Sequence, residues 1–156
     1  MTPERTGTTD AMSEDSEIQG WGRLIGRWET EGAHPMLPGE AIRGRSSFEW
    51  LDGQQFVVWR SHSDHPEIPD AISIIGVTDG RLSMHYFDSR GVYRVYEASL
   101  DRATWRYWRD APPPDLSQRF SGTFSADGNT ITGRGQLSKD GKTWEDDLDL
   151  NYQRVT

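Results

Sequence analysis

Residues 26–35 alternate between two kinds of side chain. Trp28 shares one face with small or polar residues, whereas the other face of this stretch is charged: Arg27, Glu29 and Glu31. Successive side chains of a strand point to opposite sides of its sheet, so a period of two indicates a half-buried strand. The stretch therefore predicts a first strand whose Trp28 face is buried. Such a strand suits a small barrel, and it also suits any other antiparallel sheet.

Similar segments follow along the chain, separated by turn signals. Asp-Gly pairs and related sequences at 52–53, 79–80, 89–91, 127–129 and 140–141 are typical of hairpin turns. The pattern predicts ten strands, at about 26–35, 40–51, 54–63, 71–77, 81–88, 92–100, 104–110, 120–124, 131–137 and 144–152. Short connections favour an antiparallel up-and-down barrel, because a Greek-key sandwich needs longer returns. The sandwich is the alternative fold.

The N-terminal part predicts two further features. Residues 1–17 are mostly polar, with almost nothing to bury, and we expect a disordered tail. Apolar residues then recur at helical spacing at Ile18, Trp21, Leu24 and Ile25, which predicts a short helical plug at one end of the barrel. Residues 18–156 are expected to form a single all-β domain.

Composition narrows the classes of partner. The net charge of -8 and the pI near 4.9 argue against nucleic acid and anionic membranes, because both require a basic surface. The longest uncharged run, residues 71–78, is far shorter than the roughly 20 residues of a membrane helix. The chain has no cysteine, so it has no disulfide and no thiolate chemistry. We expect a cytoplasmic protein, as a monomer or a homodimer.

The chain resembles a known group of barrels at three places. A Gly26-x-Trp28 opening follows a short helical segment, ten hairpin-linked strands succeed it, and Tyr152-x-Arg154-Val155 lies at the end. Over residues 18–156 these features resemble the calycin (lipocalin-like) barrels, and most of all the ten-stranded nitrobindin-related proteins and their bacterial relatives. The resemblance implies that Trp28 packs at the closed end of the barrel beneath Arg154 of the last strand.

The resemblance also implies haem, which nitrobindins hold through a histidine on the final strand. Here the last histidine of the chain is His85, and residues 145–151 contain none. We therefore expect no cofactor. The alternative is haem bound through His34 or His85, because an imidazole on another strand is also a ligand for iron.

Aromatic and cationic residues alternate along the predicted strands 81–88, 92–100 and 104–110. Rings supply stacking area and cations orient a polar group, which suits a pocket for a flat or anionic organic molecule. The predicted ligand-binding residues are His34, Trp59, Met84, Tyr86, Arg94, Tyr96, Trp105, Tyr107 and Arg109. In the alternative interpretation the arginines face solvent and the rings fill the interior. We favour the pocket, because filling a ten-stranded barrel requires more apolar bulk than these strands provide.

Three residues are candidates for acid or base catalysis: His34, His85 and Asp146. An unperturbed histidine titrates near pH 6.5, which suits a general base, although we favour His34 as a hydrogen-bonded residue at a strand end before Pro35. Asp146 shares a face with Trp144 and Leu148 in a regular strand. It is therefore either a catalytic acid or a buried carboxylate paired with a cation such as Arg109 or Arg134.

These residues leave three functions open. The first is binding of a small apolar or aromatic molecule, with or without an anionic group, inside the barrel. The second is an enzyme that isomerises, cyclises or dehydrates such a molecule. The third is an interaction module that uses the outer face. The polar segment 62–67 reads as a loop at the mouth of the barrel, and we expect no metal site there.

Overall fold

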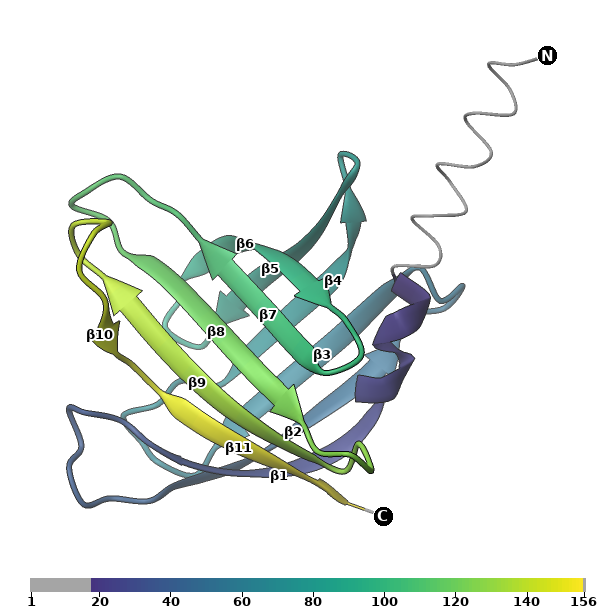
Figure 1. The fold of residues 1–156 in the computed structure, drawn as a ribbon, viewed down its shortest axis with the longest axis horizontal. Helices are drawn as coiled ribbons and strands as arrows, with labels where there is room; N and C mark the ends of the chain where they lie inside the picture. Colours follow the sequence, from purple (N-terminus) through teal and green to yellow (C-terminus); the bar gives the residue numbers. More distant parts are fainter. Residues whose placement is uncertain (1–17, 156) are drawn as a thin grey trace.

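The computed structural model describes residues 18–155, and these form one closed antiparallel barrel (Figure 1). A short 3₁₀ helix, η1 (Gly20–Leu24), precedes the first strand. The strands are β1 (Gly26–Ala33), β2 (Ile42–Trp50), β3 (Phe56–Ser63), β4 (Ala71–Thr78), β5 (Arg81–Asp88), β6 (Tyr93–Leu100), β7 (Thr104–Arg109), β8 (Ser117–Phe124), β9 (Thr130–Ser138), β10 (Glu145–Asp146) and β11 (Asp149–Val155). The predicted disordered tail lies outside the described residues.

The strand order confirms the predicted up-and-down barrel. Strands β1 to β9 each pair with their neighbours in the chain, and β11 pairs with both β9 and β1, which closes the ring. Ten long strands form this ring, and the two-residue β10 extends the line of β11 along β9. A closed ring leaves no exposed strand edge, so every long strand has hydrogen-bonded neighbours on both sides. Among the described residues, no helix is both long and apolar enough to cross a membrane.

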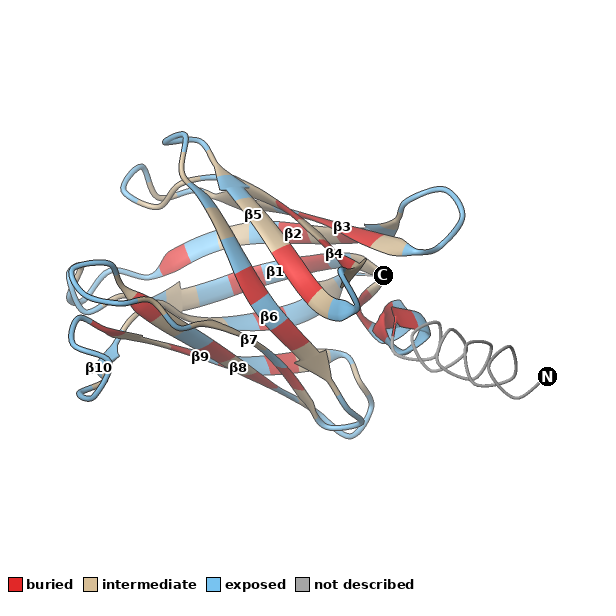
Figure 2. Ribbon diagram, turned by 90° about the horizontal axis from the view of Figure 1, so that it is seen from above, coloured by how far each residue is buried: buried red, intermediate tan, exposed pale blue. Residues whose placement is uncertain are grey.

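The two ends of the barrel differ. One end, which we call the closed end, carries η1 and the short turns at 51–55, 79–80, 101–103 and 125–129. The other, which we call the open end, carries the longer connections at 34–41, 64–70, 89–92, 110–116 and 139–144. Figure 2 shows η1 with its buried residues at the closed end, away from most of the longer connections.

A cluster of aromatic rings fills the closed half of the barrel. Trp21 and Leu24 of η1 are fully buried there, and Trp21 meets the edge of Trp105 at 6.5 Å between ring centroids. Trp105 also packs against rings from four other strands: Phe48, Trp59, Phe120 and Tyr152. Large rings that meet edge to face bury much apolar surface per residue. The predicted plug is therefore one short 3₁₀ helix that covers this core.

Trp28 and Arg154 occupy the positions that the sequence predicts. Trp28 is fully buried, its Nε1 donates a hydrogen bond to the carbonyl of Leu24 at 2.9 Å, and the guanidinium of Arg154 lies 4.2 Å from its ring centroid. Arg154 also donates to the carbonyl of Ile25 at 2.9 Å. The predicted cation–ring contact is thus confirmed. It joins the last strand to the start of β1, where the barrel closes.

One irregularity changes the face on which a predicted residue lies. Asp146 pairs with Gln136 of β9, but Leu150 pairs with Gly133, so three residues of one strand span two of the other. This one-residue bulge lies between β10 and β11, and a one-residue shift moves every side chain to the opposite face. The prediction that Asp146 shares a face with Leu148 in a regular strand is therefore wrong. Asp147 takes the inward position instead.

Candidate functional site

A cavity of about 370 Å³ lies in the open half of the barrel, opposite the packed aromatic cluster. Its volume falls in the range of pockets that hold small organic molecules, roughly 300 to 1,000 Å³. Its apolar walls come from strands and loops all around the ring: Ile42, Trp59, Ile68, Phe120, Leu148 and Leu150. The interior of the barrel is thus packed in one half and open in the other.

Six of the nine residues predicted to bind a ligand line this cavity: His34, Trp59, Tyr86, Arg94, Tyr96 and Tyr107. Met84 and Trp105 point into the barrel as well, but both are buried in the packed half. Arg109 is held by the chain itself, because it donates to the carbonyl of Leu116 and to the carboxylate of Asp115, both at 2.8 Å. The structure therefore does not bring these last three residues to the cavity.

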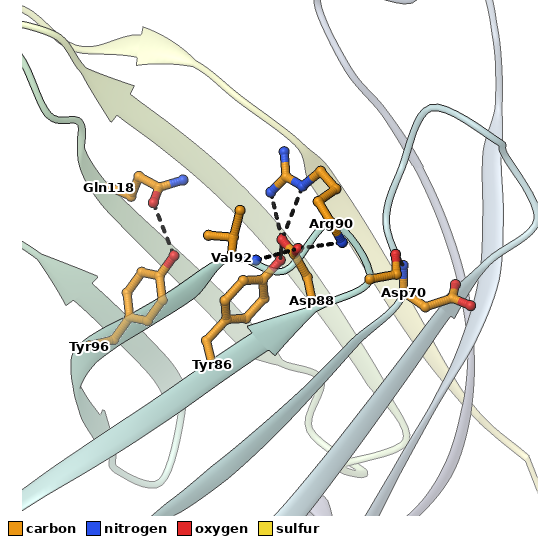
Figure 3. Close-up of polar contacts among 8 residues, drawn as sticks. Asp70, Tyr86, Asp88, Arg90, Val92, Tyr96 and Gln118 are labelled. Carbon is orange, nitrogen blue, oxygen red and sulfur yellow. Dashed lines mark hydrogen bonds and ion pairs between the residues drawn. The ribbon is translucent and has the colours of Figure 1, made fainter.

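Four tyrosines contribute to the polar lining. The hydroxyl of Tyr86 donates to Asp88 at 2.8 Å, and that of Tyr96 donates to Oε1 of Gln118 at 3.0 Å (Figure 3). Tyr107 and Tyr152 also line the cavity, and within residues 18–155 their hydroxyls have no hydrogen-bond partner. Burial raises the pKa of both residues, so their hydroxyls stay protonated at neutral pH. They are two free donors for a ligand.

Asp88 organises the β5–β6 hairpin at the open end. Its side chain is fully buried and accepts hydrogen bonds from Tyr86, from the backbone of Arg90 and Val92, and from the guanidinium of Arg90 at 2.6 Å (Figure 3). Burial alone raises the pKa of Asp88, but the hydrogen bonds from Arg90 and Tyr86 outweigh it and hold the pKa well below its usual range. The hairpin and the Tyr86 ring are thereby fixed at the cavity.

Arg94 is a cation at the cavity wall on an inward-facing strand position. It lies one residue inside β6 and pairs across the sheet with Tyr86. Burial raises the pKa of the neighbouring Tyr96, and the charge of Arg94 opposes that rise, which places the guanidinium close to the hydroxyl. Across residues 18–155, no ion pair involves Arg94. An unpaired guanidinium beside aromatic rings is suited to bind an anionic group in two-pronged geometry.

His34 and Asp147 form a second polar group at the cavity. His34 follows the end of β1, and its Nε2 lies 3.0 Å from Oδ1 of Asp147, with both side chains about one-fifth exposed. The backbone N–H of Met36 donates to Nδ1 of His34 at 3.0 Å. Because Nδ1 accepts this hydrogen bond, the ring proton is on Nε2 and is donated to Asp147. Both ring nitrogens of His34 are therefore occupied within the chain.

The other two catalytic candidates lie on the outer face. Asp146 is exposed and pairs with Arg134 at 3.3 Å. Arg134 is one of the predicted partners, but the ion pair is exposed to solvent and not buried. His85 points away from the cavity, where its ring stacks on Tyr93 and its Nδ1 lies 3.1 Å from the Tyr93 hydroxyl. The structure brings neither residue to His34.

The cavity does not fit a histidine-ligated haem. Two histidines, His34 and His62, line the cavity, and both ring nitrogens of each have partners in the chain. The last strand, β11, contributes Leu150 and Tyr152 to the wall, and the bulge before it contributes Asp147 and Leu148. Within residues 18–155 no group of three or more potential ligand side chains converges to hold a metal ion. We assign no chemistry of this site to a cofactor.

Sequence reasoning missed several residues of the site. Gln118 and Leu116 precede the predicted strand, which began at Phe120. The observed strand β8 begins three residues earlier, at Ser117. Asp147 was missed because of the bulge. Asp88 was placed in a strand but given no role, although Asp-x-Arg-Gly is a turn signal whose carboxylate typically accepts backbone N–H groups.

Together these features define a class: a ten-stranded up-and-down barrel closed at one end, with a cavity at the other that is lined by tyrosines and by Arg94. The structure is similar to the crystal structure of Rv2717c from M. tuberculosis, with a TM-score of 0.60 and 14% sequence identity over 89% of this chain and 97% of that one. At this identity the similarity shows the fold alone. No protein-family profile matches the chain, and no curated protein sequence matches it.

Proposed function

We propose that this protein binds a small aromatic or apolar molecule in the open half of its barrel, and that Arg94 binds an anionic group on that molecule. The observation that carries the proposal is the unpaired guanidinium of Arg94 at the wall of a cavity of about 370 Å³. Apolar walls supply burial, and a few oriented polar groups supply selectivity, as in most small-molecule sites.

The polar lining favours a ligand rich in hydrogen-bond acceptors. Arg94 has no ion pair within residues 18–155, and no hydrogen bond in that range is donated by the amide nitrogen of Gln118 or by the hydroxyls of Tyr107 and Tyr152. A carboxylate is the simplest group that satisfies several such donors at once. The rings of Trp59, Tyr107 and Phe120 stack or tilt against one another at the inner side of the cavity and offer faces to a flat molecule.

Binding accounts for the site better than acid–base catalysis by His34. A general base requires a free lone pair within reach of the substrate. Nδ1 of His34 accepts from Met36, and Nε2 donates to Asp147, so neither nitrogen is free. His85 and Asp146 lie outside the cavity. An isomerase, cyclase or dehydratase that uses these three residues is therefore the less supported function.

The test is a titration with a matched pair of ligands. We expect 2-naphthoate to quench tryptophan emission with saturation, because Trp59 lines the cavity, and we expect 2-naphthamide to bind more weakly. Arg94→Gln should weaken 2-naphthoate by about 1.5 to 3 kcal/mol, the scale of a hydrogen bond to a charged group. The amide should be nearly unaffected. Arg109→Gln is the control, since Arg109 is already held by Asp115 and Leu116.

Two results would contradict the proposal. If the acid and the amide lose affinity equally in Arg94→Gln, Arg94 only shapes the barrel. If neither ligand binds, the small-molecule function fails, and an interaction module on the outer face becomes the leading hypothesis. Membership of the nitrobindin-related family, a cytoplasmic location and a monomeric or homodimeric state remain predictions from the sequence.

A further inference from the structure

The carboxylate of Asp147 presents an unused acceptor to the cavity. Its Oδ1 accepts the Nε2 proton of His34 at 3.0 Å, and this bond fixes the rotation of the carboxylate. No hydrogen bond within residues 18–155 involves its Oδ2, and Asp147, about one-fifth exposed, lines the cavity. His34 is itself held by Met36, so the orientation of Asp147 is set by two successive hydrogen bonds. Asp147 is thus oriented in advance toward a partner that the chain does not supply.

Asp147 and Arg94 lie on nearly opposite walls. Around the ring the order β6, β7, β8, β9, β11 separates them by four strand steps out of ten. Both lie in the open half: Arg94 is one residue inside β6, and Asp147 follows β10 at the bulge. Asp147, Tyr96 and Tyr107 line the same cavity, and the charge of Asp147 raises the pKa of both tyrosines, in each case as a smaller contribution than burial.

The cavity therefore has a donor-rich wall and an acceptor wall. The donor-rich wall contains Arg94 and Gln118, and the acceptor wall contains the free oxygen of Asp147. A ligand that carries only a carboxylate would leave the Asp147 oxygen facing an apolar ring edge. The oxygen would then lose its water without gaining a hydrogen-bond donor, which lowers the binding affinity. A ligand with a hydrogen-bond donor at its far end would satisfy both walls.

We infer that the ligand is a bifunctional aromatic acid, with a carboxylate bound by Arg94 and a hydroxyl or protonated amine at the opposite end bound by Asp147. This inference rests on the proposed function, because it refines which molecule the same cavity binds. His34 is a positioning residue in this arrangement, since it orients the Asp147 carboxylate and does not touch the ligand. No bond of the ligand is made or broken.

The test compares three naphthoates of one shape. 2-Naphthoate has no group at the far end, 6-hydroxy-2-naphthoate adds a donor there, and 6-methoxy-2-naphthoate adds an oxygen without a donor. The intact protein should bind the hydroxy acid at least about tenfold more tightly than the methoxy acid, because a hydrogen bond to a charged acceptor is made in one case only. Calorimetric titration gives the three dissociation constants.

The variant Asp147→Asn keeps the shape of the side chain and removes its charge. It should reduce the preference for the hydroxy acid to about twofold or less, since the amide oxygen keeps the hydrogen bond from His34 and the free position then carries an N–H donor in place of a charged acceptor. Affinity for unsubstituted 2-naphthoate should be kept or should rise, because the charged acceptor that this ligand leaves unsatisfied is gone, and this also shows that the variant is folded. Asp146→Asn is the matched control: Asp146 pairs with Arg134 on the outer face, so the preference should be unchanged.

The outcomes separate this inference from the proposed function. If 2-naphthoate binds but the preference for the hydroxy acid is absent, or survives Asp147→Asn, the role of Asp147 is refuted while the proposed binding function stands. If Asp147→Asn weakens all three acids equally, Asp147 supports the wall only, and the inference is again wrong. If none of the naphthoates binds, both proposals fail together.

Discussion

Removing the Trp28 ring should destabilise the barrel strongly, because this ring lies where β1, β11 and η1 meet. Trp28 is fully buried, its Nε1 donates to Leu24, and its ring meets Tyr152 edge to face at 6.4 Å between centroids. Truncation of a buried tryptophan to alanine costs about 3 to 5 kcal/mol, through lost apolar burial and the cavity that remains. We expect Trp28→Ala to lower the free energy of unfolding by that amount.

The contact with Arg154 sets the size of a second, coupled effect. The guanidinium lies 4.2 Å from the Trp28 ring centroid and donates to the carbonyl of Ile25. A cation–ring contact contributes about 0.5 to 2 kcal/mol, depending on how far water is excluded. Arg154→Ala should therefore cost roughly 1 to 2 kcal/mol, from the lost contact and the lost packing of its stem. The double variant should cost less than the sum of the two single variants.

Urea unfolding of the four proteins in this cycle measures both effects. A coupling energy of about 0.5 kcal/mol or more is expected, because contacting side chains do not contribute additively. Glu29→Ala is a control on the same strand, since its side chain faces solvent and should change stability by less than about 0.5 kcal/mol. A loss below about 1 kcal/mol for Trp28→Ala would mean that the ring is exposed. Zero coupling would refute the pairing with Arg154.

Three further predictions concern other parts of the barrel. Asp88→Asn should lower the free energy of unfolding by about 1.5 to 3 kcal/mol at pH 7. The pKa of the Asp88 carboxyl is lowered in the folded protein, so the stabilisation is present above the unfolded pKa near 4 and is lost as the pH falls below that value. Urea unfolding of the two proteins should therefore give converging stabilities in acid. Gly133→Ala should destabilise by about 1 to 3 kcal/mol, because its Cβ would contact the carbonyl of Leu150, whereas Gly20→Ala, with open space around it, should not. Added haemin should give no saturable Soret shift of the kind that a histidine-ligated iron produces, and a stoichiometric spectrum that disappears in His34→Ala would contradict this.

Most of the fold could be predicted from the sequence, because alternation and turn chemistry are local signals. The predicted strand 81–88 matches β5 at both ends, and the Asp79-Gly80 turn that precedes it has both residues at positive φ. The burial pattern of β1 follows the predicted alternation, with Trp28 and Thr30 inside and the charged residues outside. The cation–ring contact at the closed end came from resemblance, and the structure confirms it.

The last strand could not be predicted in the same way, because the bulge leaves no local signature. Asp146 and Asp147 are consecutive and identical, so the sequence is compatible with an alternating strand in which either aspartate faces inward. The opposing strand holds Gly135, whose Cβ would meet the carbonyl of Leu148, and such close approach often accompanies a bulge. Sequence alone gives no reason to place the extra residue there. The acidic candidate was therefore assigned to the neighbouring residue.

The remaining differences at the site arise from contacts distant in sequence. His85 alternates correctly with Met84 and Tyr86, and the inward position of Tyr86 places His85 outside. Which face is inward depends on the neighbouring strands, and β5 has rings on both faces. Arg109 lies on the inward face of β7, but its guanidinium is hydrogen-bonded to Asp115 and Leu116 of the loop at 110–116 and does not line the cavity. Only the folded loop reveals this competition.

A crystal structure of the protein with 2-naphthoate tests the central claim most directly. Binding by Arg94 in the open half of the barrel predicts density for the ligand in the cavity, with its carboxylate within hydrogen-bond distance of the Arg94 guanidinium. The naphthalene rings should lie against Trp59 or Tyr107 at the inner wall. The account would be contradicted by a ligand whose carboxylate points away from Arg94, by density on the outer face only, or by a cavity that side chains fill in the presence of saturating ligand.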